Sequence, residues 1–184
     1  MSATQSSMLK LNTVAPDFNL LDTVSEKNFT LKELQSEIAT VIMFICNHCP
    51  YVVRINKGIS EFAFDYIPKG VSVIAISSND VKNYPQDSPE LMKENAMNNN
   101  FNFPYLYDET QDVAKSYDAQ CTPDIYVFNS EMKLVYRGQF DDSRPSNDIE
   151  TTGVDIRNAV DALINGKKVS DQQIPSIGCN IKWK

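Results

Sequence analysis

Several patterns that would assign a protein to a common class are missing from this 184-residue sequence. No apolar run approaches the roughly 18 residues that are needed to cross a bilayer, and the first ten residues lack the charged and apolar regions of a secretory signal. The net charge is −7 and no run of five or more basic residues occurs, which disfavours nucleic acid and anionic membranes as partners. We therefore expect a cytoplasmic protein that binds neither nucleic acid nor membrane.

Metal-binding side chains are also scarce, because the chain has one histidine and four cysteines. A structural zinc ion takes about four ligands, and only one pair of cysteines is closely spaced. We therefore expect no metal and no cofactor. Structural disulfides are rare in the cytoplasm, so the cysteines are expected to be free, catalytic or metal-bound.

The closely spaced pair lies in the segment Cys46-Asn47-His48-Cys49-Pro50. An apolar run, 40–45, precedes it and reads as a buried strand, and an amphipathic helix is predicted over 51–66. A thiolate at the start of a helix is stabilised by unpaired N–H groups and by the helix dipole. Proline suits the first helical turn. This arrangement predicts a redox-active dithiol, with a zinc half-site and two inert core cysteines as the alternatives.

Neighbouring residues can support or extend this dithiol. His48 can donate a hydrogen bond or a positive charge to the thiolate, and Asn47 suits a turn beside it. Cys121 is either a small buried apolar residue or a further redox thiol. Cys179, near the C-terminus, either folds back to the dithiol or anchors the tail. The loop 141–144 reads as solvated, with a substrate-facing role as the alternative.

Strands and helices alternate along the chain, which predicts an α/β protein with a central mixed sheet and helices on both faces. Residues 1–12 are expected to be a flexible N-terminus and residues 13–184 a single domain that includes the C-terminal tail. Thr30 with Glu33 predicts a capped helix start, as does Thr152 with Asp155. The expected strands are 40–45, 71–77, 103–108, 124–129 and 134–140, and the expected helices are 51–66, 89–98, 111–117 and one that follows Thr152 and ends before Gly166.

The strand–Cys-x-x-Cys–helix unit and the Thr122-Pro123 strand start resemble the thioredoxin superfamily. A closer resemblance, to the peroxiredoxin-like (redoxin) branch related to alkyl hydroperoxide reductase and thiol-specific antioxidant proteins, covers nearly the whole chain. It is carried by the segments 14–18, 44–51, 78–80, 108–111, 121–124, 141–145 and 175–179. The resemblance implies a thioredoxin-like fold with an N-terminal extension and a C-terminal tail. It also implies that Pro123 is cis, although sequence alone favours trans, and that Pro123 faces the dithiol and shapes the groove where a partner chain docks.

The sequence differs from both peroxiredoxins and thioredoxins at positions that support catalysis in those families. Peroxiredoxins carry a Thr or Ser three residues before the attacking cysteine and a Pro seven before it; here these positions are Cys46 and Ile42. The peroxiredoxin arginine falls at Pro123, and the buried acid of thioredoxins falls at Thr40. Asp124 is our hypothetical substitute for that acid as a proton acceptor.

We therefore predict an enzyme, a thiol–disulfide oxidoreductase, in which Cys46 attacks a disulfide and Cys49 resolves the mixed disulfide. One alternative is a weak thiol peroxidase, with Cys49 oxidised and then resolved by Cys46 or Cys179. The other is a non-catalytic redox-sensing module. The expected partners are a protein or small-molecule disulfide or peroxide substrate and a thioredoxin- or glutathione-type reductant.

Overall fold

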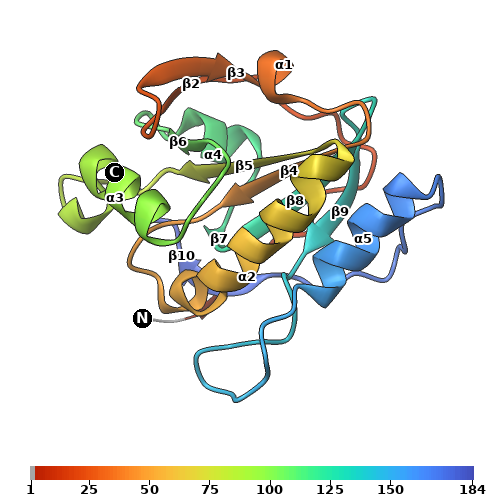
Figure 1. The fold of residues 1–184 in the computed structure, drawn as a ribbon. Helices are drawn as coiled ribbons and strands as arrows, with labels where there is room; N and C mark the ends of the chain where they lie inside the picture. Colours follow the sequence, from red (N-terminus) through yellow and green to blue (C-terminus); the bar gives the residue numbers. More distant parts are fainter. Residues whose placement is uncertain (1–2) are drawn as a thin grey trace.

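The computed structural model describes residues 3–184 (Figure 1). The helices are α1 (Leu31–Leu34), α2 (Pro50–Tyr66), α3 (Pro89–Asn98), α4 (Asp112–Ser116) and α5 (Val154–Ile164), with short 3-10 helices at Ile67–Lys69 and Pro85–Asp87. The strands are β1 (Ala3–Gln5), β2 (Asn19–Asp22), β3 (Lys27–Thr30), β4 (Ala39–Phe44), β5 (Val71–Ser77), β6 (Tyr105–Tyr107), β7 (Cys121–Thr122), β8 (Asp124–Asn129), β9 (Leu134–Gly138) and β10 (Ile177–Asn180).

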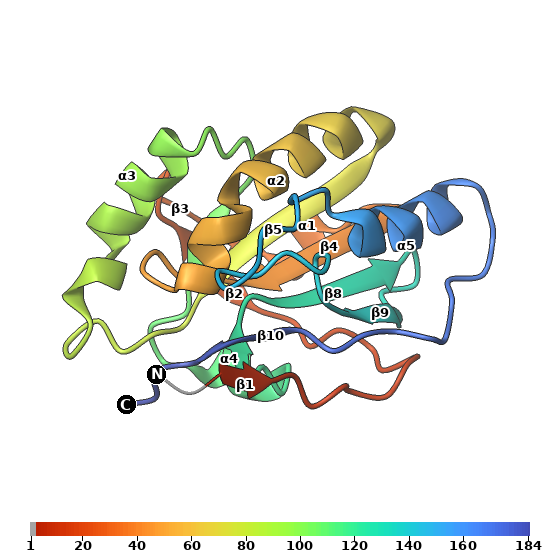
Figure 2. The same cartoon turned by 90° about the horizontal axis from the view of Figure 1, so that it is seen from below.

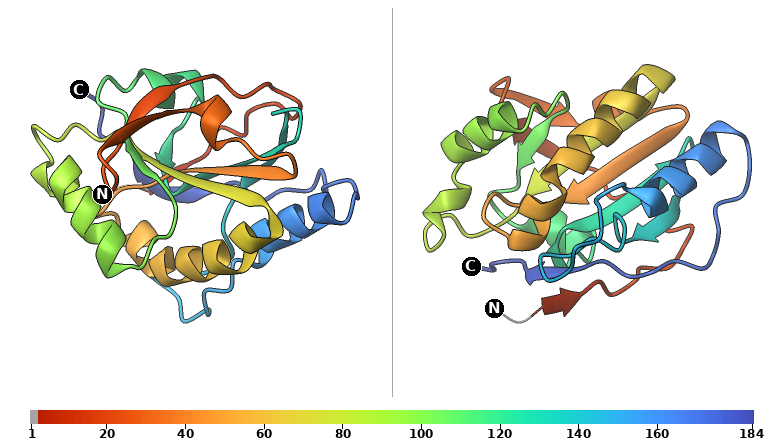
Figure 3. Two further views of the ribbon diagram at one scale, coloured as in Figure 1. Left: turned by 45° about the horizontal axis from the view of Figure 1, so that its top comes forward. Right: turned by 60° about the horizontal axis from the view of Figure 1, so that its bottom comes forward.

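Seven strands form the central sheet in the order β3-β2-β6-β5-β4-β8-β9. The strands β4, β5 and β6 run parallel to one another, whereas β8 and β9 pair antiparallel at one side and β2 and β3 at the other. The sheet is therefore mixed, as expected. Helices α2, α3 and α5 cover one face, and α1 and α4 lie on the other (Figure 3, left).

Strand β4 is buried on both faces, which explains why its sequence is apolar apart from Thr40. Val41 and Met43 point into the core beneath α2 and α5, whereas Ile42 and Phe44 point into the second core beneath α1 and α4. Side chains along a strand alternate between the two faces. The end of β4 therefore delivers the following loop to the edge of the first core, where α2 begins.

A second, smaller sheet has the order β1-β10-β7. Its strands are all antiparallel: Cys179 pairs with Ala3 on one side and with Thr122 on the other. Figure 2 shows β1 and β10 side by side, so the two ends of the described chain meet here. The expected flexible segment 1–12 included residues 1 and 2, which lie outside the described residues, but Ala3–Gln5 forms a regular strand.

The start of α5 differs from the expected Thr152 cap. Gly153 is the N-cap, with a φ of 67°, and the Asp141 carboxylate accepts hydrogen bonds from the N–H groups of Thr152 and Gly153, both at 2.7 Å. A buried side chain from the loop after β9 thus holds the two residues that lead into this helix. The Thr30–Glu33 capping box at α1 is present as expected. Within residues 3–184, no helix combines the length and apolarity that crossing a bilayer requires.

Candidate redox site

The dithiol lies where the sequence placed it, between β4 and α2. Cys49 is the N-cap of α2 and Pro50 is its first residue. All four cysteines are free thiols, and Cys46 and Cys49 are only 1% and 0% exposed. A partner can therefore reach the two sulfur atoms only after a covering segment moves.

Thr122 and Pro123 face the dithiol across the site. The Thr122–Pro123 peptide bond is cis, which confirms what the resemblance implied. The Thr122 hydroxyl lies 3.4 Å from the Cys46 sulfur, and the Thr122 carbonyl accepts a hydrogen bond from the Cys49 thiol at 3.1 Å. One residue therefore contacts both sulfurs through two different atoms.

The environment favours a thiolate on Cys49 and a thiol on Cys46. Hydrogen-bond donation from the Cys46 thiol, aided by the Cys179 thiol, the Thr122 side chain and the Val52 N–H, lowers the pKa of Cys49 to about 5, against the effect of burial. The hydrogen bond to Cys49, burial and the negative charge of Asp87 together raise the pKa of Cys46. The hydrogen bond from the Cys49 thiol to the Thr122 carbonyl stabilises the protonated form. The surrounding donors stabilise the thiolate more strongly, so the pKa of Cys49 is lowered.

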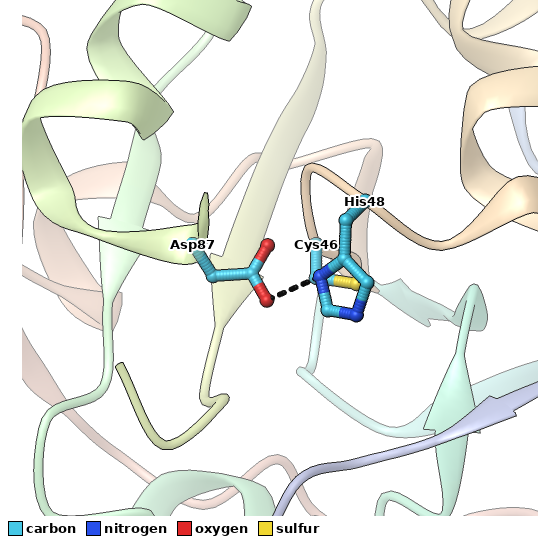
Figure 4. A group of neighbouring side chains, drawn as sticks. All are labelled: Cys46, His48 and Asp87. Atoms are coloured by element: carbon cyan, nitrogen blue, oxygen red, sulfur yellow. Dashed lines mark ion pairs between the residues drawn. The ribbon is translucent and has the colours of Figure 1, made fainter. Parts of the chain in front are cut away.

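Asp87 anchors the two residues that separate the cysteines, Asn47 and His48 (Figure 4). Asp87 was not predicted from the sequence as a site residue. Its buried carboxylate accepts hydrogen bonds from the Asn47 N–H and from the Asn79 side-chain amide, both at 2.8 Å. His48 Nδ1 lies 2.7 Å from Asp87 Oδ2. This contact has poor hydrogen-bond alignment, because Nδ1 has no well-aligned partner among the described residues. The imidazole is thus turned toward Asp87. His48 is not among the causes of the pKa shifts of Cys46 and Cys49.

Cys46, His48 and Asp87 also form a candidate ligand set for a metal ion, because one ligand atom of each lies within 4.8 Å of the other two. The sequence gives no sign of this group, because Asp87 is distant in the chain from Cys46 and His48. Three ligands match an open catalytic zinc site better than a closed structural one. Metal binding here would occupy the Cys46 sulfur and therefore compete with dithiol chemistry.

The structure corrects the role that we suggested for Asp124. Alternation along β8 puts Asp124 on the same face as Tyr126, whereas the dithiol lies on the other face. Its carboxylate lies 3.1 Å from Nη2 of Arg137, and both side chains are fully buried. Burial raises the pKa of Asp124, and the Arg137 charge opposes that rise. Asp124 is therefore committed to a buried ion pair and does not face the dithiol.

The two remaining cysteines differ in their relation to the dithiol. The Cys121 thiol donates to the Pro123 carbonyl at 3.5 Å, and burial raises its pKa far above the ordinary value. Cys179 belongs to the same apolar cluster as Cys49, and burial and the hydrogen bond to Cys49 raise its pKa to about 12. Of the two, the structure brings Cys179 to the dithiol.

The loop after β9 also reaches this region. Asp141 is buried and holds the start of α5, so this part of the loop is not solvated. Arg144 lines a small pocket beside Pro123, together with Tyr51, Phe140 and Ile177. This placement is compatible with the substrate-facing alternative for the loop.

The mixed sheet, the dithiol at a helix start and the cis-proline opposite it define a protein with a thioredoxin-like fold. Solved structures agree with this description. The chain is similar to an uncharacterized conserved protein from Geobacillus kaustophilus, with 54% identity over 100% of this chain and 97% of that one and a TM-score of 0.99. It is also similar to a hypothetical protein from Sinorhizobium meliloti 1021, with 46% identity over 98% of each chain and a TM-score of 0.96.

The thioredoxin domain of a thiol-disulfide oxidoreductase from Bacteroides vulgatus shares the fold, with 17% identity over 70% of this chain and 88% of that one and a TM-score of 0.60. Residues 11–137 match the model of the AhpC/TSA family. The chain therefore belongs to the AhpC/TSA family. No curated protein matches the sequence.

Proposed function

We propose that this protein is a thiol–disulfide oxidoreductase that uses Cys46 and Cys49. The observation that carries the proposal is that both sulfurs contact Thr122, directly before the cis-proline. The environment that favours a thiolate on Cys49 supports a nucleophile there at neutral pH. This order of attack is the reverse of the one suggested by sequence, in which Cys46 attacked first.

The proposed cycle exchanges one disulfide for another. The Cys49 thiolate attacks one sulfur of a partner disulfide, and the other partner sulfur leaves as a thiolate that takes up a proton. Cys46 then loses its proton and attacks Cys49, which breaks the mixed disulfide and releases the second partner thiol. The partner gains two electrons, and Cys46 and Cys49 become a disulfide. A thioredoxin- or glutathione-type thiol reductant restores the dithiol.

The test is reduction of a small aromatic disulfide and of a protein disulfide by the full chain, with dithiothreitol as the reductant. We expect turnover in the wild type, loss of turnover to background in Cys49→Ser, and a stable mixed disulfide with the partner when Cys46 and Cys179 are both replaced by serine. Cys121→Ser is the matched control, because it removes a buried thiol that is bonded elsewhere. Full activity in Cys49→Ser contradicts the assignment, and one oxidation event without turnover in the wild type favours a redox sensor.

A weak thiol peroxidase is the second candidate. The AhpC/TSA match and the position of Cys49 at the helix start, directly before Pro50, favour it. Cys49 would be oxidised to a sulfenic acid by a peroxide and resolved by a neighbouring thiol. Stopped-flow consumption of hydrogen peroxide tests this candidate, and a second-order rate constant no greater than that of free cysteine rejects it.

A further inference from the structure

The C-terminal strand β10 pairs with β7 next to the dithiol and carries a third thiol into the same apolar cluster. Cys179 pairs in antiparallel register with Thr122, the same residue that contacts Cys46 and Cys49. Cys179 is 4% exposed and belongs to the apolar cluster that contains Cys46 and Cys49. Three cysteines, one from the loop after β4, one from the N-cap of α2 and one from β10, therefore gather around Thr122.

Gly178 makes this close approach possible. A Cβ atom at this position would lie 2.0 Å from the Thr122 carbonyl oxygen and 2.7 Å from the carbonyl carbon. These neighbours are backbone atoms, so no side-chain rotation can make room. The residue before Cys179 thus has to be glycine for β10 to reach the dithiol in this register.

We infer that Cys179 is a third redox thiol, which exchanges with the Cys46–Cys49 disulfide to form a Cys49–Cys179 disulfide that closes the site with β10. The inference rests on the proposed function in one respect, namely that the Cys46–Cys49 disulfide is the species with which Cys179 exchanges. It extends that function, because the strand that carries Cys179 pairs with the backbone directly before Pro123. A partner chain that needs the same edge reaches Cys49 only when β10 has moved away.

The exchange conserves electrons and protons. Cys179 loses its proton and its thiolate attacks the sulfur of Cys49, and a Cys49–Cys179 bond forms while the Cys46–Cys49 bond breaks. Cys46 leaves as a thiolate and takes up a proton. The chain stays oxidised by two electrons throughout, and a thiol reductant returns the Cys49–Cys179 disulfide to two thiols.

Backbone pairing makes the second disulfide a local event. Cys179 pairs with Thr122 through the backbone, and the Cys49 thiol donates to the Thr122 carbonyl, so joining the two sulfurs requires no unfolding of the central sheet. The Cys49 thiolate disfavours loss of the Cys179 proton in the reduced protein. This opposition disappears when Cys49 is part of a disulfide, so oxidation of the dithiol favours the attack by Cys179.

The test is disulfide mapping in the full chain after oxidation with diamide and blocking with N-ethylmaleimide. Trypsin releases Cys46 and Cys49 together in peptide 33–54, Cys121 in 116–133 and Cys179 in 169–182. In Cys46→Ser we expect the loss of two free thiols per chain and a cross-link between 33–54 and 169–182. In Cys49→Ser we expect far less of this cross-link, and Cys121→Ser is the control that should behave as wild type.

The inference is overturned if Cys46→Ser protein keeps its free thiols after diamide treatment. It is also overturned if Cys49→Ser gives as much of the cross-link as Cys46→Ser does, or if peptide 116–133 is cross-linked to 169–182. Cys46→Ala gives a second route if the serine variant does not fold, as judged by circular dichroism. The two proposals fail separately. A wild type without disulfide-reductase turnover but with the cross-link in Cys46→Ser rejects only the proposed function, whereas turnover without that cross-link rejects only the role of Cys179.

Discussion

The Thr122 carbonyl oxygen lies 3.1 Å from the Cys49 sulfur, so the backbone before the cis-proline directly contacts the thiol with the lowered pKa. The same residue pairs with Cys179 of β10. Thr122 therefore links the reactivity of Cys49 to the position of β10, which controls access to the thiol. A change that moves β10 alters the environment of Cys49. Oxidation of Cys49 in turn alters its interaction with Cys179, which lies on β10.

The first prediction concerns the pH dependence of Cys49. Its pKa is lowered to about 5 in the folded protein, so the thiolate is present above that pH and is lost as the pH falls through it. Cys46→Ala removes the principal donor, and the pKa of Cys49 should rise toward the ordinary cysteine value of about 8.5. Absorbance of the thiolate at 240 nm across a pH titration measures both. Cys121→Ser should leave the titration unchanged, and an unshifted pKa in Cys46→Ala contradicts the hydrogen bond between the two thiols.

The second prediction concerns Asp87. Its negative charge contributes to the raised pKa of Cys46. In a Cys49→Ser background, where Cys46 is the only thiol of the pair, Asp87→Asn should therefore lower the pKa of Cys46. The asparagine also places an amide against the Asn47 N–H and the Asn79 amide, which should cost about 1–3 kcal/mol of stability.

Thiolate absorbance and urea unfolding measure these two effects of Asp87→Asn. Asp80→Asn changes another buried carboxylate in the same region that is not among the causes of the Cys46 shift, and it is the control. Unchanged Cys46 titration in the Asp87 variant argues against electrostatic coupling between the two residues.

The elements with strong local signals are predictable from the sequence. The runs 40–45 and 71–77 are mostly apolar because β4 and β5 are buried on both faces, and Cys46 and Cys49 share one motif. Asp87 gave no such signal, because its contact with the Asn47 N–H joins residues 40 positions apart. Strand β10 was missed because its four residues pair only with strands of three and two residues, which leave no recognisable period. The Asp87 contact and the pairing of β10 both join residues far apart in the chain, and sequence periodicity carries no information about such contacts.

The third prediction separates Asp124 from the redox chemistry. Asp124→Asn leaves the buried Arg137 without its closest counter-charge, and we expect a loss of about 3–5 kcal/mol in the free energy of unfolding. The Cys49 titration should not change, because Asp124 lies on the opposite face of the sheet. Urea unfolding and 240 nm absorbance are the measurements. Asp118→Asn, which alters a half-exposed partner of Arg137 at 3.8 Å, should cost less than about 1 kcal/mol. A shift in the pH profile of disulfide exchange in Asp124→Asn would restore Asp124 as a proton acceptor.

The last prediction concerns Gly178. Alanine at this position brings a Cβ to within 2.0 Å of the Thr122 carbonyl, so β10 must move away from β7. Overpacking of this kind costs about 1–3 kcal/mol, and urea unfolding should show a loss of that size. In a Cys46→Ser background the same change should reduce the yield of the Cys49–Cys179 cross-link, because the two sulfurs separate. Asn180→Ala, an exposed side chain on the same strand, should alter neither quantity. An undiminished cross-link in Gly178→Ala would show that β10 reaches Cys49 without the pairing that the structure shows.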